Sequence, residues 1–218
     1  MKTETKCLHS GYEPKNGEPR QLPICQSTTF KYDSSDAMGR LFDLEDSGYF
    51  YTRLQNPTND AVAAKIADLE GGVAGMLTSS GQAANFFALF NICETGSHIV
   101  ASSSIYGGTY NLLAHTLPTY GITTKFVDAD DLSNIENAID DKTKAVFIET
   151  IGNPNATLID IEAVAEIAHK HKIPLVVDST FATPYLVRPI EYGADIVVHS
   201  ATKFIGGHGT AIGGVIVD

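Results

Sequence analysis

Residues 160–203 decide the fold of this chain, and they read DIEAVAEIAHKHKIPLVVDSTFATPYLVRPIEYGADIVVHSATK. A helical pattern covers Asp160–His171, and two short runs of β-branched residues follow it at Leu175–Asp178 and Asp195–His199. Short strands that alternate with helices are typical of a mostly parallel sheet that carries helices on both faces. The stretch therefore predicts an α/β fold.

The same alternation continues on both sides of this stretch. Asn56 and Pro57 are favoured at the start of a helix, and the glycine pair at 71–72 would end that helix. Further helices are expected over Gln82–Ile92 and Asp131–Ile139. The remaining predicted strands cover Val73–Thr78, His98–Ala101, Ile122–Val127, Ala145–Glu149 and Gly214–Val217.

Residues 1–55 have a different character, because prolines and glycines interrupt every regular pattern in them. We expect an extended N-terminal arm that wraps over another part of the assembly, and the alternative is a terminus without fixed structure. Residues 56–218 are expected to form one large ligand-binding domain. The sequence stops directly after the apolar run Gly214–Val217, so we expect this domain to be truncated.

Composition disfavours several classes of function. The 218 residues are 43% hydrophobic and 19% charged, as in an ordinary folded protein. The formal net charge of -11 disfavours nucleic acid as a partner, because an acidic surface repels phosphates. No apolar run approaches the roughly 18 residues of a membrane span. The three widely spaced cysteines disfavour a disulfide framework or a metal site, and they fit a cytoplasmic location.

In sheets of this kind ligands bind at the carboxyl ends of the strands, so the residues after each strand are the candidates for chemistry. Ser80, Gly81 and Gln82 follow the first strand and open a helix, whose free N–H groups and dipole would attract a phosphate. Tyr106 follows the second strand beside two glycines and could lie flat on a planar ring. A tight strand-to-helix turn and a packing tyrosine are the alternatives.

Three further strand ends carry polar groups. Asn153 could donate a hydrogen bond to a ligand oxygen, although an Asn-Pro turn would explain it as well. Asp178 ends an apolar run and should be partly buried, which requires a cationic ligand atom, a remote arginine or a capping role. Lys203 follows a core strand and precedes a glycine-rich stretch, and in a desolvated pocket its amine would be a nucleophile.

Together these strand ends supply an anion cradle, an aromatic plate, an oxygen contact, a buried carboxylate and a reactive amine. Pyridoxal 5'-phosphate (PLP) offers the matching groups: a phosphate, a flat ring, a phenolic oxygen, a basic pyridine nitrogen and an aldehyde. Enzymes that use PLP need a lysine that forms an imine with the aldehyde and an acidic partner for the nitrogen. The pattern therefore predicts a PLP site built on Lys203 and Asp178.

Six segments resemble, in order, the signature of the Cys/Met-metabolism PLP-dependent enzymes. They are YTRLQNPTND (51–60), TSSGQAA (78–84), YGGTYNL (106–112), ETIGNPN (149–155), VVDSTFATP (176–184) and HSATKFIGGHGT (199–210). The resemblance extends over nearly all of residues 5–218. It implies the aspartate aminotransferase-like fold, known as fold type I, with these residues forming its large domain.

The resemblance implies a role for each matching residue. Lys203 would form the imine and move the α-proton, Asp178 would pair with the pyridine nitrogen, and Tyr106 would stack on the ring and assist acid–base chemistry. The residues implied in cofactor binding are Ser80, Gly81, Gln82, Asn153, Ser200, Thr202 and, toward the neighbouring subunit's cofactor, Tyr51 and Arg53. Two positions depart from the family pattern, since Gln82 replaces a common methionine and Ser179 replaces a common asparagine.

Within the family, YGGTYNLLAHTLP and KFIGGHGTAIGGVIVD most resemble the O-acetylhomoserine sulfhydrylases. This resemblance implies a reaction of methionine biosynthesis, in which O-acetylhomoserine and sulfide give homocysteine and acetate. Cystathionine γ-synthase and methionine or cystathionine γ-lyase are the alternatives. The resemblance also implies a dimer or tetramer and a C-terminal domain, absent here, that holds the arginine for the substrate carboxylate. The chain alone is therefore expected to be inactive.

Two other classes of protein are disfavoured, because this chain lacks all or part of their signature motifs. Residues 200–203 spell S-x-x-K, the motif of penicillin-binding enzymes, but the S-D-N and K-T-G motifs that accompany it do not occur. A nucleotide-binding module would need G-x-G-x-x-G after the first strand, and that spacing is missing too. A yellow absorbance that borohydride reduces would distinguish a PLP enzyme from both.

Overall fold

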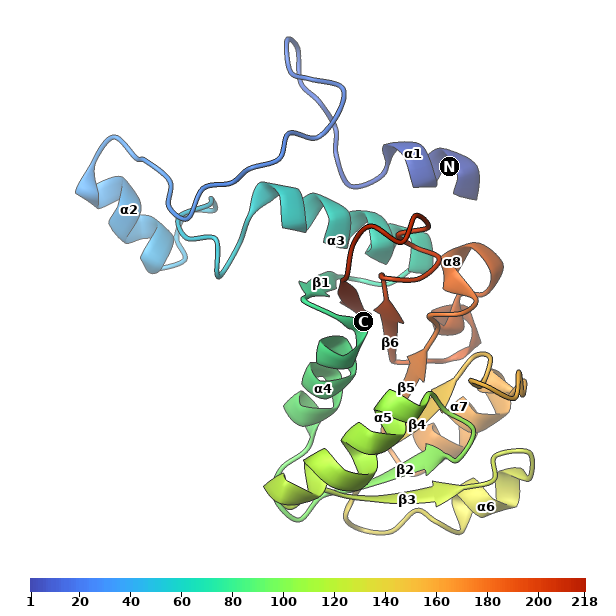
Figure 1. Cartoon of the computed structure of the whole chain (residues 1–218). Helices are drawn as coiled ribbons and strands as arrows, with labels where there is room; N and C mark the ends of the chain where they lie inside the picture. Colours follow the sequence, from blue (N-terminus) through green and yellow to red (C-terminus); the bar gives the residue numbers. More distant parts are fainter.

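The computed structural model describes residues 1–218, and its centre is a seven-stranded sheet with helices on both faces (Figure 1). The strand order is β1-β7-β6-β5-β4-β2-β3. β7 runs antiparallel to both of its neighbours, and all other neighbouring strands are parallel. The strands are β1 (Gly75–Thr78), β2 (His98–Ser102), β3 (Thr123–Val127), β4 (Thr143–Glu149), β5 (Leu175–Asp178), β6 (Ile196–Ser200) and β7 (Gly214–Val217). All seven predicted strands are present, and the predicted α/β fold is confirmed.

Different helices cover the two faces of the sheet. Phe147 of β4 packs in the layer that contains α4, whereas its neighbours Val146 and Ile148 pack in the layer that contains α7. The alternation follows from the strand period of two, and it buries both faces of the central strands. The elements on the α4 face are α4 (Gly81–Ile92), α5 (Gly107–Asn111), η1 (Leu112–Thr116) and η2 (Leu117–Tyr120).

The remaining helices cover the rest of the sheet and connect its strands. None of the helices in the molecule is both long enough and apolar enough to cross a membrane. The helices α6 and α7 pack together, and α3 packs against β1 and β7. The bounds of these elements are α3 (Pro57–Glu70), α6 (Leu132–Glu136), α7 (Ile161–Lys170), α8 (Thr183–Leu186) and η3 (Pro189–Tyr192).

The helix α3 begins and ends where the sequence predicted. The side-chain oxygen of Asn56 accepts a hydrogen bond from the N–H of Thr58 at 2.9 Å, and Pro57 occupies the first helical position. These residues satisfy or remove donors that have no partner inside the helix. Gly71 ends the helix with φ 80°, a left-handed conformation that favours glycine.

Two helical regions differ from the sequence-based expectation. The predicted helix Asp131–Ile139 ends early, because the N–H groups of Ala138 and Ile139 bond to carbonyls three residues back and tighten the last turn. Residues 107–120 form helical turns, although their glycine pair indicates a turn on local preference alone. Leu113 and Leu117 are fully buried there, so packing against the sheet stabilises the helical turns despite the glycines.

The N-terminal segment, residues 1–55, is only partly an extended arm. It contains α1 (Thr3–His9) and α2 (Ser35–Phe42), which the sequence did not predict, joined by irregular chain. Lys6 ties α1 to α3 through an ion pair with Asp68 at 2.8 Å. The helix α2, by contrast, lies away from the sheet (Figure 1). Part of the segment therefore packs on its own domain, and part extends away from it.

A buried pair of polar side chains joins α3 to β6. Glu70 is the last residue of α3, and one of its carboxylate oxygens lies against Nε2 of His199 in β6. Both side chains are completely buried. A buried carboxylate or imidazole is costly without a partner, so this contact specifies how the end of α3 meets the strand that leads to Lys203.

Candidate active site

A cavity of about 680 Å³ opens beside the carboxyl ends of β4, β5 and β6 and the N-terminus of α4. This is the edge at which parallel sheets bind ligands. The predicted site residues that line it are Ser80, Gly81, Gln82, Tyr106, Asn153, Asp178, Ser200, Thr202 and Lys203. Tyr51 and Arg53 do not line it. Five separate segments of the sequence thus meet at one cavity.

Asp178 ends β5, lines this cavity and is 9% exposed. Its Oδ1 accepts a hydrogen bond from the N–H of Thr180 at 3.0 Å, and its Oδ2 accepts one from the Asn85 amide at 3.2 Å. No cationic side chain pairs with it. The remote arginine considered from the sequence is therefore wrong, whereas the turn contact is present. A buried carboxylate with neutral partners alone favours a cationic ligand atom.

The N-terminus of α4 faces the same cavity. The hydroxyl of Ser80 accepts a hydrogen bond from the N–H of Ala83 at 3.1 Å and caps the helix. The N–H groups of Gly81 and Gln82 precede the first intrahelical partner and remain available to an anion. A Cβ at Gly81 would lie 2.5 Å from the Cβ of Ser200, so glycine is needed for this close approach of α4 to the end of β6.

Tyr106 immediately precedes α5, and its ring is half exposed rather than packed in the core. Tyr106 is therefore not part of the hydrophobic core of this chain. A Cβ at Gly108 would lie 2.4 Å from Cε1 of the Tyr106 ring, whereas a Cβ at Gly107 would meet nothing within 4 Å. Gly108 thus makes room for the ring, and Tyr106 can present its face to a ligand in the cavity.

Lys203 lies in the turn after β6, where its N–H donates to the carbonyl of Ser200 at 3.2 Å. The side chain lines the cavity but is exposed, so the expected desolvated pocket is not formed by this chain. The glycines that follow, 206, 207 and 209, carry no side chains that could cover it. The amine is therefore accessible from the open side of the cavity.

The remaining predicted cofactor-binding residues differ in whether their polar groups already have hydrogen-bond partners in the protein. The hydroxyl of Thr202 is engaged with the backbone of Gly213, at 3.1 Å as acceptor and 3.3 Å as donor. The N–H of Ser200 donates to Oγ1 of Thr180 at 2.7 Å. Asn153 is exposed, and only its backbone N–H has a partner, the carboxylate of Glu149 at 3.1 Å.

Sequence reasoning missed three polar residues of the cavity, Glu149, Asn85 and Thr180. Glu149 ends β4, pairs in register with Asp178 and is 5% exposed. Burial, and then the neighbouring charge of Asp178, raises the pKa of Glu149 to about 7. Asn85 is 1% exposed, and its amide oxygen has no partner. Glu149 carried the same signal as Asp178, a carboxylate that ends an apolar run, and Asn85 lies one helical turn after Gly81.

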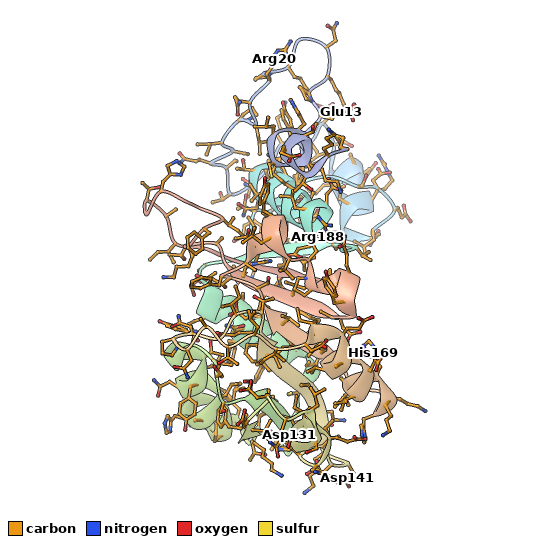
Figure 2. All side chains as sticks on the ribbon, turned by 90° about the vertical axis from the view of Figure 1, so that its right-hand side faces the viewer. Glu13, Arg20, Asp131, Asp141, His169 and Arg188 are labelled. Carbon is orange, nitrogen blue, oxygen red and sulfur yellow. The ribbon has the colours of Figure 1, made fainter.

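Lys203 is the only lysine or arginine that lines the cavity. Arg188 forms an ion pair elsewhere, and Arg20 lies in the N-terminal segment at one end of the molecule (Figure 2). The guanidinium of Arg53 lies 5.1 Å from the centre of the Tyr51 ring, outside the cavity. An anion bound in this cavity would therefore meet neutral hydrogen-bond donors and one amine, that of Lys203.

The family model described as "Cys/Met metabolism PLP-dependent enzyme" matches residues 4–218. The chain belongs to this family. O-acetyl-L-homoserine sulfhydrylase of Leptospira meyeri is 52% identical, over 100% of this chain and 50% of its own length. Homocysteine synthase of Schizosaccharomyces pombe is 52% identical, over 99% of this chain and 51% of its own length. The chain of this Cys/Met metabolism PLP-dependent enzyme thus spans about half the length of these curated relatives.

A crystal structure confirms the fold at the level of the whole chain. It is named as an O-acetylhomoserine (thiol)-lyase from Campylobacter jejuni, and it contains N'-pyridoxyl-lysine-5'-monophosphate. Its TM-score with this chain is 0.96 at 40% sequence identity, covering 100% of this chain and 54% of that one. The Cys/Met metabolism PLP-dependent enzyme described here therefore has the expected large-domain fold, and the S-x-x-K and nucleotide-binding alternatives are set aside.

Proposed function

We propose that this Cys/Met metabolism PLP-dependent enzyme binds PLP in the cavity beside β4, β5, β6 and α4. We further propose that the whole protein replaces the γ-acetoxy group of O-acetylhomoserine with sulfide, which yields homocysteine and acetate. The observation that carries the proposal is that Lys203 and the unpaired buried carboxylate of Asp178 line one cavity. The relatives named above, at 52% identity, support this reaction within the family.

The residues present fit PLP group by group. Asp178 is a buried anion without a cationic partner, which suits a protonated pyridine nitrogen. The open N-terminus of α4 suits the phosphate, and the half-exposed ring of Tyr106 suits the face of the cofactor. The residues that would hold the cofactor are Lys203, Asp178, Tyr106, Ser80, Gly81, Gln82, Asn153, Ser200 and Thr202.

When bound, PLP supplies an electron sink that acidifies the α-proton of an amino-acid substrate. Lys203 would hold the cofactor covalently and, when its amine is free, take the proton from the substrate α-carbon at Nζ. Asp178 would keep the pyridine nitrogen protonated through the negative charge of its carboxylate. Tyr106 would orient the ring by stacking, and its hydroxyl would serve as an auxiliary acid and base.

Residues 1–55 are proposed to contact a neighbouring subunit, with 56–218 as the PLP-binding domain. Tyr51 and Arg53 would then reach the phosphate of the neighbouring subunit's cofactor. The support is electrostatic, since no arginine lines the cavity while a phosphate group carries close to two negative charges. A guanidinium can donate two parallel hydrogen bonds to such a group. The proposed assembly is at least a dimer, and a tetramer by family resemblance.

Borohydride reduction of the protein loaded with PLP tests the cofactor assignment. Digestion and mass spectrometry should locate the reduced pyridoxyl group on Lys203, and label on any other lysine would contradict the proposal. Lys203→Ala should abolish both the label and turnover. Lys125→Ala, an exposed lysine of β3, is the matched control and should leave both unchanged.

Product analysis tests the reaction. The protein at its natural length is incubated with O-acetylhomoserine and sulfide, and separately with O-acetylhomoserine and cysteine. Homocysteine from the first mixture is the expected main product. Preferred formation of cystathionine would indicate a cystathionine γ-synthase instead, and breakdown of methionine or cystathionine without a second substrate would indicate a γ-lyase.

A further inference from the structure

Glu149 makes two contacts that join separate walls of the cavity. Its Oε1 accepts a hydrogen bond from the N–H of Tyr106 at 2.8 Å, and its Oε2 accepts one from the N–H of Asn153 at 3.1 Å. Tyr106 follows β2, whereas Asn153 follows β4, and they are 47 positions apart in the chain. One buried carboxylate therefore sets where both segments leave the sheet.

These two contacts are stronger anchors than their number suggests. When Glu149 is ionised, above its pKa of about 7, these hydrogen bonds are about twice as strong as neutral ones. Glu149 is 5% exposed, so water competes little for its oxygens. The Tyr106 side chain has no hydrogen bond of its own, and its ring is half exposed. The Tyr106 carbonyl accepts a hydrogen bond from the N–H of Tyr110 at 2.9 Å within the following helical turn, so the contact to Glu149 is the polar interaction that links Tyr106 to the sheet.

The charged and titratable groups around Glu149 come from three directions. Asp178 lies beside it on β5, Lys203 lines the same cavity from the turn after β6, and the Tyr106 hydroxyl lies at the start of α5. Burial and the charge of Asp178 raise the pKa of Glu149, while the two N–H donors lower it. Only the ionised carboxylate offers two unprotonated oxygens, one to accept each of the two hydrogen bonds.

We propose that Glu149 is a positioning residue for the cofactor ring, because it holds Tyr106 and Asn153 in place through their backbone N–H groups. This role rests on the proposed function, since both partners are assigned to the ring face and ring oxygen of PLP. Glu149 itself need not touch the cofactor. Its loss would leave the phosphate cradle of α4 intact but would free the two groups that fix the tilt of the ring.

The test compares Glu149→Gln with Glu166→Gln in the PLP-loaded protein. Glutamine keeps the size of the side chain but offers only one oxygen, so one N–H must face an amide NH₂. Glu166 is exposed on α7 and serves as the matched control. The measurements are the circular dichroism of the cofactor band, amide hydrogen exchange of the peptides that contain Tyr106 and Asn153, the dissociation constant for PLP, and kcat.

For Glu149→Gln we expect a changed cofactor dichroism band and about tenfold faster exchange at Tyr106 or Asn153, the effect of one lost hydrogen bond. The kcat should fall about tenfold or more, while PLP affinity should change by less than about threefold because the phosphate contacts remain. Glu166→Gln should change none of these. An unaltered cofactor band and unaltered exchange in Glu149→Gln would overturn the positioning role.

Two further outcomes separate this inference from the proposed function. If Glu149→Gln does not fold, amide hydrogen exchange of the unaltered protein is the test. Unprotected amides at Tyr106 and Asn153 would then overturn the positioning role without any variant. If the unaltered protein forms no PLP adduct at Lys203, the proposed function falls and the positioning role falls with it. If the unaltered protein forms the adduct normally and Glu149→Gln changes neither the cofactor band nor the exchange, the positioning role is wrong and the proposed function stands.

Discussion

Asp178 and Glu149 end neighbouring strands of the sheet, but their partners give them different chemistry. Glu149 accepts two backbone N–H groups that belong to the walls of the cavity, whereas Asp178 accepts one turn N–H and one side-chain amide. Both are nearly buried. Glu149 therefore fixes the backbone of two cavity walls, whereas Asp178 contacts only the turn that follows it and the Asn85 side chain.

At the residue scale, Asp178→Asn should separate cofactor binding from catalysis. Asparagine keeps the shape but cannot balance a proton on the pyridine nitrogen. We expect bound PLP to remain and turnover to fall by at least about 100-fold, since removing one partner of a buried charge pair costs ~3 kcal/mol or more. Asp141→Asn, at the end of the molecule opposite the N-terminal segment (Figure 2), is the control. Near-normal turnover of Asp178→Asn would refute the assigned role.

Glu149 should also affect stability in a pH-dependent way. Its pKa is raised from 4.5 to about 7 in the folded protein, so the folded state retains a proton that the unfolded state has lost. The resulting stability is complete below about pH 4.5 and is lost as the pH rises through about 7. Urea unfolding of the cofactor-free protein at several pH values should therefore show wild type losing up to roughly 3 kcal/mol relative to Glu149→Gln over this window. Parallel stability curves for the two proteins would contradict the shift.

At the element scale, the junction between β2 and α5 depends on one of two adjacent glycines. A Cβ at Gly108 would meet the flexible Tyr106 ring at 2.4 Å, whereas a Cβ at Gly107 would meet open space. Gly108→Ala should therefore displace the Tyr106 ring with little loss of stability, and Gly107→Ala should not.

The comparison of these two variants can be made on the PLP-loaded protein. We expect Gly108→Ala to change the dichroism of the cofactor band and to lower kcat by about tenfold, because small misplacements of orienting groups are costly in rate. Gly107→Ala should keep both near wild type. Equal effects of the two substitutions would show that helix propensity, rather than room for the ring, is the reason for the glycine pair.

At the scale of the whole molecule, the proposed shared site predicts complementation between inactive variants. Lys203→Ala lacks the amine of its own site, and Arg53→Ala lacks the proposed contact to the neighbouring subunit's cofactor. When the two are unfolded, mixed and refolded together, half of the dimers should be mixed, and each of these should hold one intact site. Activity should therefore recover to about a quarter of wild type. No recovery would contradict a site shared between subunits.

Much of the architecture could be predicted from local pattern. The seven strands, the capped start of α3 at Asn56 and its end at Gly71 each depend on preferences that act over a few residues. Lys203 and Asp178 could be found for the same reason, since a polar residue directly after a core strand lies at the ligand-binding edge of a parallel sheet. The helical turns over 107–120 could not, because burial of leucines decides there against local preference.

The sequence by itself determined the strands, the class of fold and the residues at the strand ends that face the cavity, such as Lys203 and Asp178, because strand periodicity and strand ends are local properties. Only the tertiary structure decided that β7 lies antiparallel between β1 and β6, and that Glu149 reaches Tyr106. It also decided that Lys203 is exposed and that Arg53 lies outside the cavity of its own chain. These features depend on packing between segments far apart in the chain, and no local pattern records that packing.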